Sequence, residues 1–177
     1  MSDARYTITK GDSFELIKSV ADNSVDLLIT SPPYNIGKVY ERESDLHTYL
    51  TPYVEFAKDA FAKLAPSGSV CWEVGNYVKN GEVFPLDVYF YDIFKEAGFK
   101  LRNRIIWHFE HGLHASKRFS GRYETILWFT KGDEYIFNLD SVRVPSKYPG
   151  KLHYKGEKKG LPSGNPLGKI LLISGHF

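Results

Sequence analysis

One short segment limits the folds open to this chain more than any other: an apolar run that ends in two consecutive prolines. Residues 25–30 read Val-Asp-Leu-Leu-Ile-Thr, which is typical of a strand buried on both faces of a sheet. Residues 31–34 read Ser-Pro-Pro-Tyr, and the strand is expected to stop there because proline cannot donate to a strand ladder. The segment predicts an internal strand that leads directly into a stiff turn.

Around this strand, segments with strand and helix patterns alternate. Alternating or continuous apolar residues predict strands over 5–10, 25–30, 69–74, 101–109 and 123–131. Apolar residues at helical spacing predict helices over 14–20, 50–64 and 86–97. The last two strands are joined by a loop without a helix, which favours an antiparallel pair. The order predicts an α/β fold with a mostly parallel sheet and an antiparallel strand pair at one end.

The composition is that of one globular domain. The chain has 177 residues, of which 42% are hydrophobic and 25% charged. The aromatic share of 15% fits an aromatic core or rings that stack on bases. A single cysteine, Cys71, excludes an internal disulfide and favours a cytoplasmic location. No signal peptide and no membrane span are expected, since no apolar run approaches about 18 residues.

Positive charge is concentrated where the strand and helix pattern ends. Residues 141–177 contain seven lysines and arginines and one acidic residue, a balance of +6, whereas the whole chain carries only +2. We therefore divide the chain into residues 1–138, a globular region, and residues 139–177, a basic and loop-rich segment. Such a segment favours a polyanionic partner, and a merely solvated tail is the alternative.

The Ser-Pro-Pro-Tyr segment also lies where a ligand site belongs, because the crevice of an open α/β sheet is at the carboxyl ends of its strands. It resembles the signature of the DNA adenine-N6 and cytosine-N4 methyltransferases, in which Asp, Asn or Ser precedes Pro-Pro and an aromatic residue. The resemblance includes the Gly11-Asp12 turn, residues 24–27 and residues 35–38, and it covers most of 8–169. It is closest to the subgroup whose catalytic half comes first. A proline turn that only ends a strand is the alternative.

The resemblance implies a partial Rossmann-like methyltransferase sheet and transfer of a methyl group from S-adenosylmethionine to an exocyclic amino nitrogen of double-stranded DNA. Ser31 Oγ and the Pro32 carbonyl would accept hydrogen bonds from the amino group, and Pro33 would stiffen the turn. The target base must leave the duplex, and the Tyr34 ring offers a stacking face. These four are the expected catalytic residues. The cofactor is expected at Asp12, Ser13, Ser31 and Pro32, although Asp12 could simply cap a helix.

Two basic regions are expected to contact DNA. The loop over 110–122 supplies His114, Lys117, Arg118 and Arg122, with Phe119 among them, and the basic segment supplies Lys147 and Lys151. An exposed polar loop is the alternative for the first region. His108, His111 and His114 are spaced by three, but Gly112 argues against a shared helical face, so no metal site is expected.

The sequence lacks the Phe-x-Gly-x-Gly loop with which the family holds the cofactor's methionine end. We therefore expect a fragment, a half completed by a second polypeptide or by self-association, or a remnant that is weakly active or inactive alone. Residues 170–177 turn abruptly apolar, and a one-base frameshift would place them out of frame; a true C-terminal strand is the alternative.

The resemblance favours an enzyme of a restriction-modification system, with the target base, cytosine N4 or adenine N6, left open. Two further alternatives remain at this point. The chain could be a non-catalytic DNA-binding module, or an RNA or protein N-methyltransferase.

Overall fold

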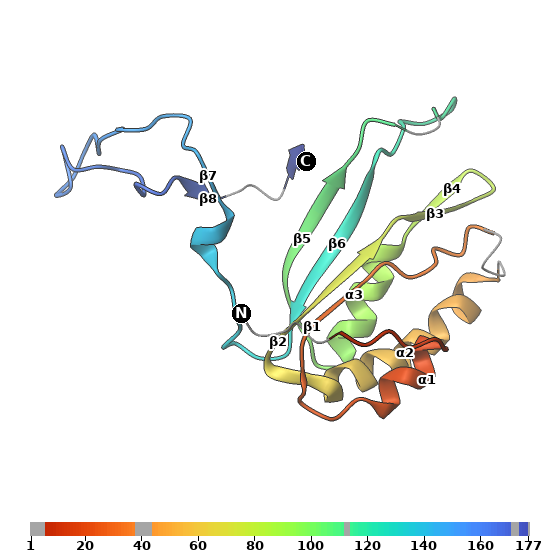
Figure 1. The fold of residues 1–177 in the computed structure, drawn as a ribbon. Helices are drawn as coiled ribbons and strands as arrows, with labels where there is room; N and C mark the ends of the chain where they lie inside the picture. The colour runs from red at the N-terminus through yellow and green to blue at the C-terminus, as the bar shows by residue number, and fades with distance from the viewer. Residues whose placement is uncertain (1–5, 38–43, 112–113, 171–173, 177) are drawn as a thin grey trace.

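The computed structural model describes residues 6–37, 44–111, 114–170 and 174–176 (Figure 1). Its centre is a five-stranded sheet in the order β1-β2-β6-β5-β9. Neighbours β1–β2 and β5–β9 are parallel, whereas β2–β6 and β6–β5 are antiparallel. The α/β class and the antiparallel pair are therefore confirmed. The strands are β1 (Val25–Thr30), β2 (Leu64–Val74), β5 (Lys100–His108), β6 (Tyr123–Thr130) and β9 (Ser174–His176).

Three helices precede or connect these strands. They are α1 (Ser13–Leu16), which continues as the 3₁₀ turn η1 (Ile17–Ser19), α2 (Leu46–Lys63) and α3 (Leu86–Glu96). The Asp45 carboxylate accepts the Thr48 amide at 3.0 Å, which caps α2 and starts it earlier than the apolar spacing predicts. None of the helices within the described ranges is both long and apolar enough to cross a membrane.

Some local predictions are wrong. Residues 6–10 form no strand, and the fifth residue of the chain, where the first strand was expected to begin, lies outside the described residues. A hairpin of β3 (Asn76–Lys79) and β4 (Glu82–Pro85) was not expected, although its turn residues Asn80 and Gly81 both have positive φ, as a two-residue hairpin turn requires. Other expectations concern residues that also lie outside the described ranges. These are Lys38, Gly112, residues 171–173 and Phe177.

The core lies between the sheet and the helices α2 and α3, and it is built largely from aromatic rings. Trp72 of β2 is 1% exposed and its ring lies 5.0–5.8 Å from four other rings. These four are Tyr53, Phe56, Phe90 and Phe94. Part of the aromatic excess in the sequence therefore serves packing.

The opposite face of the sheet is open. In β1, Val25 and Leu28 pack toward the core, but Leu27 is 56% exposed and Ile29 74% exposed. The prediction that this strand is buried on both faces is therefore wrong for the described residues. Ile29 pairs with Cys71 of β2 on the same face, and Trp107 of β5 is also exposed there. We call Leu27, Ile29, Cys71 and Trp107 the open face; Figure 1 shows α1, α2 and α3 gathered on the other side.

The basic segment is more ordered than a loop. It begins with a 3₁₀ turn, η2 (Leu139–Val142), and β7 (Arg143–Val144) pairs with β8 (Lys169–Ile170). Between them, residues 151–163 double back on themselves. The His153 amide donates to the Leu161 carbonyl at 2.9 Å and the Ser163 amide to the Lys151 carbonyl at 2.8 Å. We call residues 151–163 the basic finger.

Candidate active site and DNA-facing surface

The Ser-Pro-Pro-Tyr turn leaves the carboxyl end of β1, beside the end of its parallel neighbour β2. Pro32 is buried, Tyr34 is half-buried, and Ser31 is exposed. The hydroxyl oxygens of Ser31 and Tyr34 lie 2.8 Å apart and share a hydrogen bond. The four residues, with Ile36 and Glu124, line a recess of about 420 Å³. We call it the catalytic recess.

The backbone of this turn is held by residues that sequence reasoning missed. The Tyr49 hydroxyl of α2 donates to the Pro33 carbonyl at 2.6 Å. Asn35 is 1% exposed, has a left-handed φ of 60°, and its side-chain amide donates to the Ser44 carbonyl and accepts the Ser44 amide, both at 2.8 Å. The turn is therefore fixed on both sides before any ligand arrives, which is the condition for preorganised hydrogen bonding.

The Tyr34 ring lies directly against the backbone where β2 ends. A Cβ atom at Gly75 would stand 3.0 Å from Tyr34 Cε2 and 3.7 Å from Glu124 Cγ. The approach to the ring is tighter than ordinary contact, so a side chain here would displace the ring by a few tenths of an ångström, whereas the Glu124 side chain could stay in place. Gly75 therefore leaves room for the ring that was expected to stack on a base.

A second recess of about 460 Å³ adjoins the first and shares Tyr34, Ile36 and Glu124 with it. The loop between β5 and β6 contributes Arg118 and Phe119 to its wall. We call it the aromatic recess, because Phe109 and Tyr123 also line it. The structure thus brings the Ser-Pro-Pro-Tyr turn and part of the expected DNA-contact loop to one place.

The residues of that loop differ in their surroundings. Lys117, Arg118 and Phe119 are exposed, Phe119 completely so. The Arg122 guanidinium donates to the Glu110 carbonyl at 2.6 Å and lies 3.0 Å from a ring nitrogen of His114, so these side chains also brace the loop. Lys117 and Arg118 remain the better candidates for phosphate contacts.

Glu124 lines the catalytic recess and Glu73 is its acidic neighbour, and the sequence alone singled out neither. Glu73 of β2 and Glu124 of β6 share one face of the sheet. Burial and the neighbouring charge of Glu73 raise the pKa of the Glu124 carboxyl above its ordinary value. They are far apart in the sequence, and only the strand pairing brings them together.

Asp12 and Ser13, expected at the cofactor, stand at the start of α1. The Asp12 carboxylate accepts the Phe14 amide at 2.9 Å, which is a helix cap, and Ser13 is the first helical residue. Asp12 also lines a recess of about 450 Å³ with Phe14 and Pro52, separate from the catalytic recess. An exposed carboxylate next to an aromatic ring suits the hydroxyl and amino groups of an adenosine, so capping and cofactor binding are compatible.

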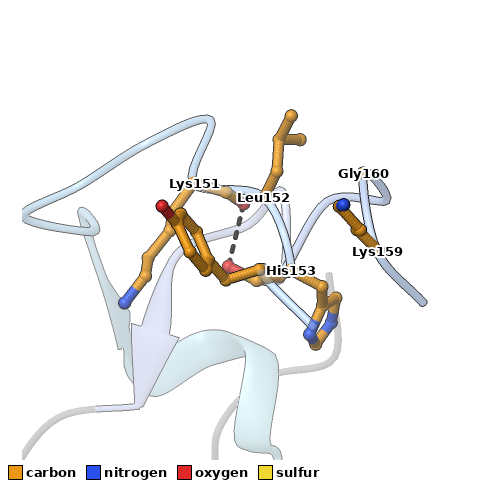
Figure 2. Close-up of a pocket in the computed structure, with 7 residues that line it drawn as sticks. Lys151, Leu152, His153, Lys159 and Gly160 are labelled. Carbon is orange, nitrogen blue, oxygen red and sulfur yellow. Dashed lines mark hydrogen bonds between the residues drawn. The ribbon is translucent and has the colours of Figure 1, made fainter. Parts of the chain in front are cut away.

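The basic finger has a recess of about 1150 Å³, shown in Figure 2. Lys151, His153 and Lys159 line it, and Tyr154 beside them is 88% exposed. Lys147, just before the finger, is exposed too, and its ammonium lies 5.7 Å from the Tyr148 ring centre. In the parts of the chain that the structure covers, no three His, Cys, Asp or Glu side chains gather as metal ligands would.

Comparison with known proteins identifies the family to which the chain is similar. The family profile of the N6 and N4 methyltransferases, described as DNA methylases, matches residues 25–174. The Type II methyltransferase M.BglII of Bacillus subtilis is 52% identical over 163 residues, which is 92% of this chain and 45% of M.BglII. M.ScaI of Streptomyces caespitosus is 35% identical over 90% of this chain and 51% of its own length. The chain thus spans about half the length of these curated relatives.

Solved structures give the same result. The cytosine-N4-specific PvuII DNA methyltransferase superposes with a TM-score of 0.59 at 27% identity, over 71% of this chain and 48% of that one. A Thermus thermophilus protein described as a DNA modification methylase, solved with S-adenosyl-L-methionine, gives a TM-score of 0.58 at 27% identity, over 76% of this chain and 61% of that one. With a family profile that matches most of its length, this chain belongs to the DNA methylase family of N6 and N4 methyltransferases.

Proposed function

We propose that this protein transfers a methyl group from S-adenosylmethionine to an exocyclic amino nitrogen of a base flipped out of double-stranded DNA. The observation that carries the proposal is the Ser-Pro-Pro-Tyr turn, held rigidly at the carboxyl end of β1 and open to a recess. Membership of the family supports the same reaction. A role in a restriction-modification system fits relatives named as Type II methyltransferases, and a cytoplasmic location is part of the proposal.

The residues of the turn would act on the lone pair of the amino group. That lone pair is delocalised into the base, so the nitrogen is a poor nucleophile. Hydrogen bonds from its N–H groups to Ser31 Oγ and the Pro32 carbonyl favour a tetrahedral nitrogen and return the lone pair to it. The acceptors need no reorganisation because Tyr49 and Asn35 hold the turn.

The extruded base would lie in the aromatic recess, against the Tyr34 ring. A flipped base is held by stacking and by hydrogen bonds to its edge, and several aromatic residues line this recess. The bound cofactor supplies an electrophilic methyl group, and Asp12 and Ser13 are the residues that would contact its adenosine. Among the relatives, PvuII methyltransferase is named cytosine-N4-specific and YhdJ of Escherichia coli a DNA adenine methyltransferase. We propose cytosine N4 here, with adenine N6 as the alternative.

The open face supports a further part of the proposal. A sheet face with Leu27 and Ile29 more than half exposed is an apolar surface of the kind that packs against more polypeptide. We propose that a second polypeptide, or a second copy of this chain, covers it and completes the methyltransferase fold. The 177-residue chain on its own would then transfer methyl groups slowly or not at all, because reacting groups must be held in line at about 3–3.5 Å.

Light scattering during gel filtration tests this part. The purified chain should associate with rising concentration, and Ile29→Glu should weaken the association because it places a charge on the open face. Val88→Glu is the matched control, since Val88 is 49% exposed on α3, on the opposite side of the sheet. A chain that stays monomeric at all concentrations would exclude the copy, and unchanged association in Ile29→Glu would exclude this face.

A non-catalytic DNA-binding module is the second candidate function. The open face favours it too, because a sheet that is covered on one face only can be an incomplete methyltransferase fold without catalytic activity. Calorimetry with S-adenosylmethionine separates the two. A measurable affinity for S-adenosylmethionine that is weaker in the Asp12→Ala variant supports an enzyme. DNA binding with no cofactor affinity, in the chain and in its completed form, supports the module. An RNA or protein substrate would appear as methyl transfer to those polymers instead of DNA.

The basic segment should act through phosphates. Lys147→Ala with Lys151→Ala should weaken binding to all DNA sequences alike and reduce the slope of log affinity against log salt by about one unit per lost contact. Lys58→Ala with Lys95→Ala, on two helices, removes the same charge and should change the slope less. An equal slope for both double variants, measured by fluorescence anisotropy, would show that the segment is only solvated.

A further inference from the structure

The strand register places Glu124 next to the end of β2, at the edge of the sheet where the proposed site lies. Glu73 pairs with Ile126 and Val74 with Thr125, so Glu124 comes next along β6, on the same face as Glu73 and beside Gly75. Glu124 is the acidic residue that lines both the catalytic and the aromatic recess. The Tyr34 ring and the Glu124 side chain both approach Gly75, since a Cβ atom there would stand 3.0 Å from Tyr34 Cε2 and 3.7 Å from Glu124 Cγ. Glu124 therefore lines the same recesses as the ring on which the base would stack.

The charged and titratable groups around Glu124 come from four parts of the chain. They are Glu73 from β2, Tyr34 from the turn after β1, Arg118 from the β5–β6 loop and Tyr123 from β6. Its partner across β5 is Trp107, which carries no charge. Burial is the largest cause that raises the pKa of Glu124. The charge of Glu73 and a hydrogen bond with Glu73 raise this pKa further. A carboxylate with a raised pKa is a stronger base than an ordinary glutamate.

We propose that Glu124 is a further catalytic residue, the acceptor of the proton that the target amino group loses, and that Glu73 is a positioning residue that tunes it. The proposal rests on the proposed function. The amino nitrogen forms a bond to the methyl carbon while the carbon–sulfur bond of the sulfonium breaks and its electron pair stays on sulfur. The positive charge passes to nitrogen, and one N–H proton then moves to the Glu124 carboxylate and later to solvent.

This role explains why a carboxylate stands here, beside a turn without a group that can take up and hold a proton. Ser31 Oγ and the Pro32 carbonyl can orient the amino group, but neither can keep its proton at neutral pH. A carboxylate also opposes the positive charge as it grows on nitrogen, before the proton moves. Glu73 keeps a second negative charge nearby, so the Glu124 carboxyl binds the proton more strongly.

The first test measures protonation and needs no turnover. Carboxyl carbon NMR of the 177-residue chain should show Glu124 titrating above the ordinary value of 4.5. Glu73→Gln should lower that midpoint, since it removes a like charge. Glu96→Gln, an exposed glutamate at the end of α3, should leave it unchanged. A Glu124 midpoint at the ordinary value, or one that Glu73→Gln does not move, would overturn the proposed tuning.

The second test measures single-turnover methyl transfer to DNA against pH, in the form of the protein that is active. The wild-type rate should fall as acid protonates Glu124, and Glu73→Gln should shift this fall to lower pH. Glu124→Gln should be roughly 100-fold slower or more and should lose the acid limb, while DNA binding and the flipped-base signal of 2-aminopurine persist. A Glu124→Gln rate within about threefold of wild type would overturn the role. No transfer to DNA by the wild type would instead overturn the proposed function.

Discussion

Replacing Ser31 with alanine should slow single-turnover methyl transfer to DNA about 100- to 1000-fold, with little change in DNA affinity. The hydroxyl oxygen is one of two acceptors that hold the amino group in its reactive geometry, and loss of one preorganised hydrogen-bonding partner in a transition state costs about this much. DNA affinity comes mainly from phosphate contacts, whereas the proposed contact of Ser31 is with the amino group of the base. Rapid-quench kinetics with labelled cofactor and anisotropy with the same DNA measure the two effects.

The matched control for Ser31→Ala is Tyr34→Phe. Both variants remove the 2.8 Å hydrogen bond between the two hydroxyls, but Tyr34→Phe keeps the Ser31 oxygen and the stacking ring. We therefore expect Tyr34→Phe to stay much closer to the wild-type rate. If the two variants lose the same factor, the hydroxyl pair only stabilises the turn, and Ser31 does not act on the amino group.

Trp72→Ala should lower the free energy of unfolding by about 3–5 kcal/mol, the usual cost of removing a large buried ring. Trp72 is 1% exposed, and its ring contacts rings from both covering helices, so its loss leaves a cavity between the sheet and the helices. Urea denaturation followed by circular dichroism measures the change. A loss of this size is a large share of the stability of a domain.

Trp107→Ala is the control for Trp72→Ala, because it removes the same side chain from the open face. Trp107 is 44% exposed, so we expect a change of about 1 kcal/mol or less. Equal losses for the two variants at a concentration where the chain is monomeric would show that the core does not lie where the structure puts it.

Local patterns in the sequence were enough to find most of the fold. The β1 segment was predicted with its observed bounds, and α3, β5 and β6 within a residue or two, because apolar spacing and turn residues determine such elements locally. The burial of β1 was wrong because apolar composition does not tell which face is covered. Leu27 and Leu28 look alike in the sequence, yet Leu27 is on the open face and Leu28 packs against the core.

The candidate site also has one part that the sequence predicts and another part that it does not. The Ser-Pro-Pro-Tyr turn could be found because it is contiguous and follows an apolar strand. Tyr49 and Glu124 could not be found in this way, because long-range packing brings each of them to the turn. Tyr49 donates a hydrogen bond from α2, and Glu124 is placed by the register of β2 with β6. Gly75 is one glycine among 15, and only the nearby Tyr34 ring shows why this position has no side chain.

The central claim, amino methylation of DNA, is tested most directly by incubating the protein with labelled S-adenosylmethionine and double-stranded DNA of varied sequence. Because we propose that more polypeptide covers the open face, the assay includes the chain alone and the chain with its completing partner. The DNA is then digested to nucleosides. We expect label in N4-methylcytosine, with N6-methyladenine as the alternative from the same turn, and only in duplexes that contain a specific site. Label at a carbon atom of a base, or in no nucleoside under any of these conditions, would contradict the account.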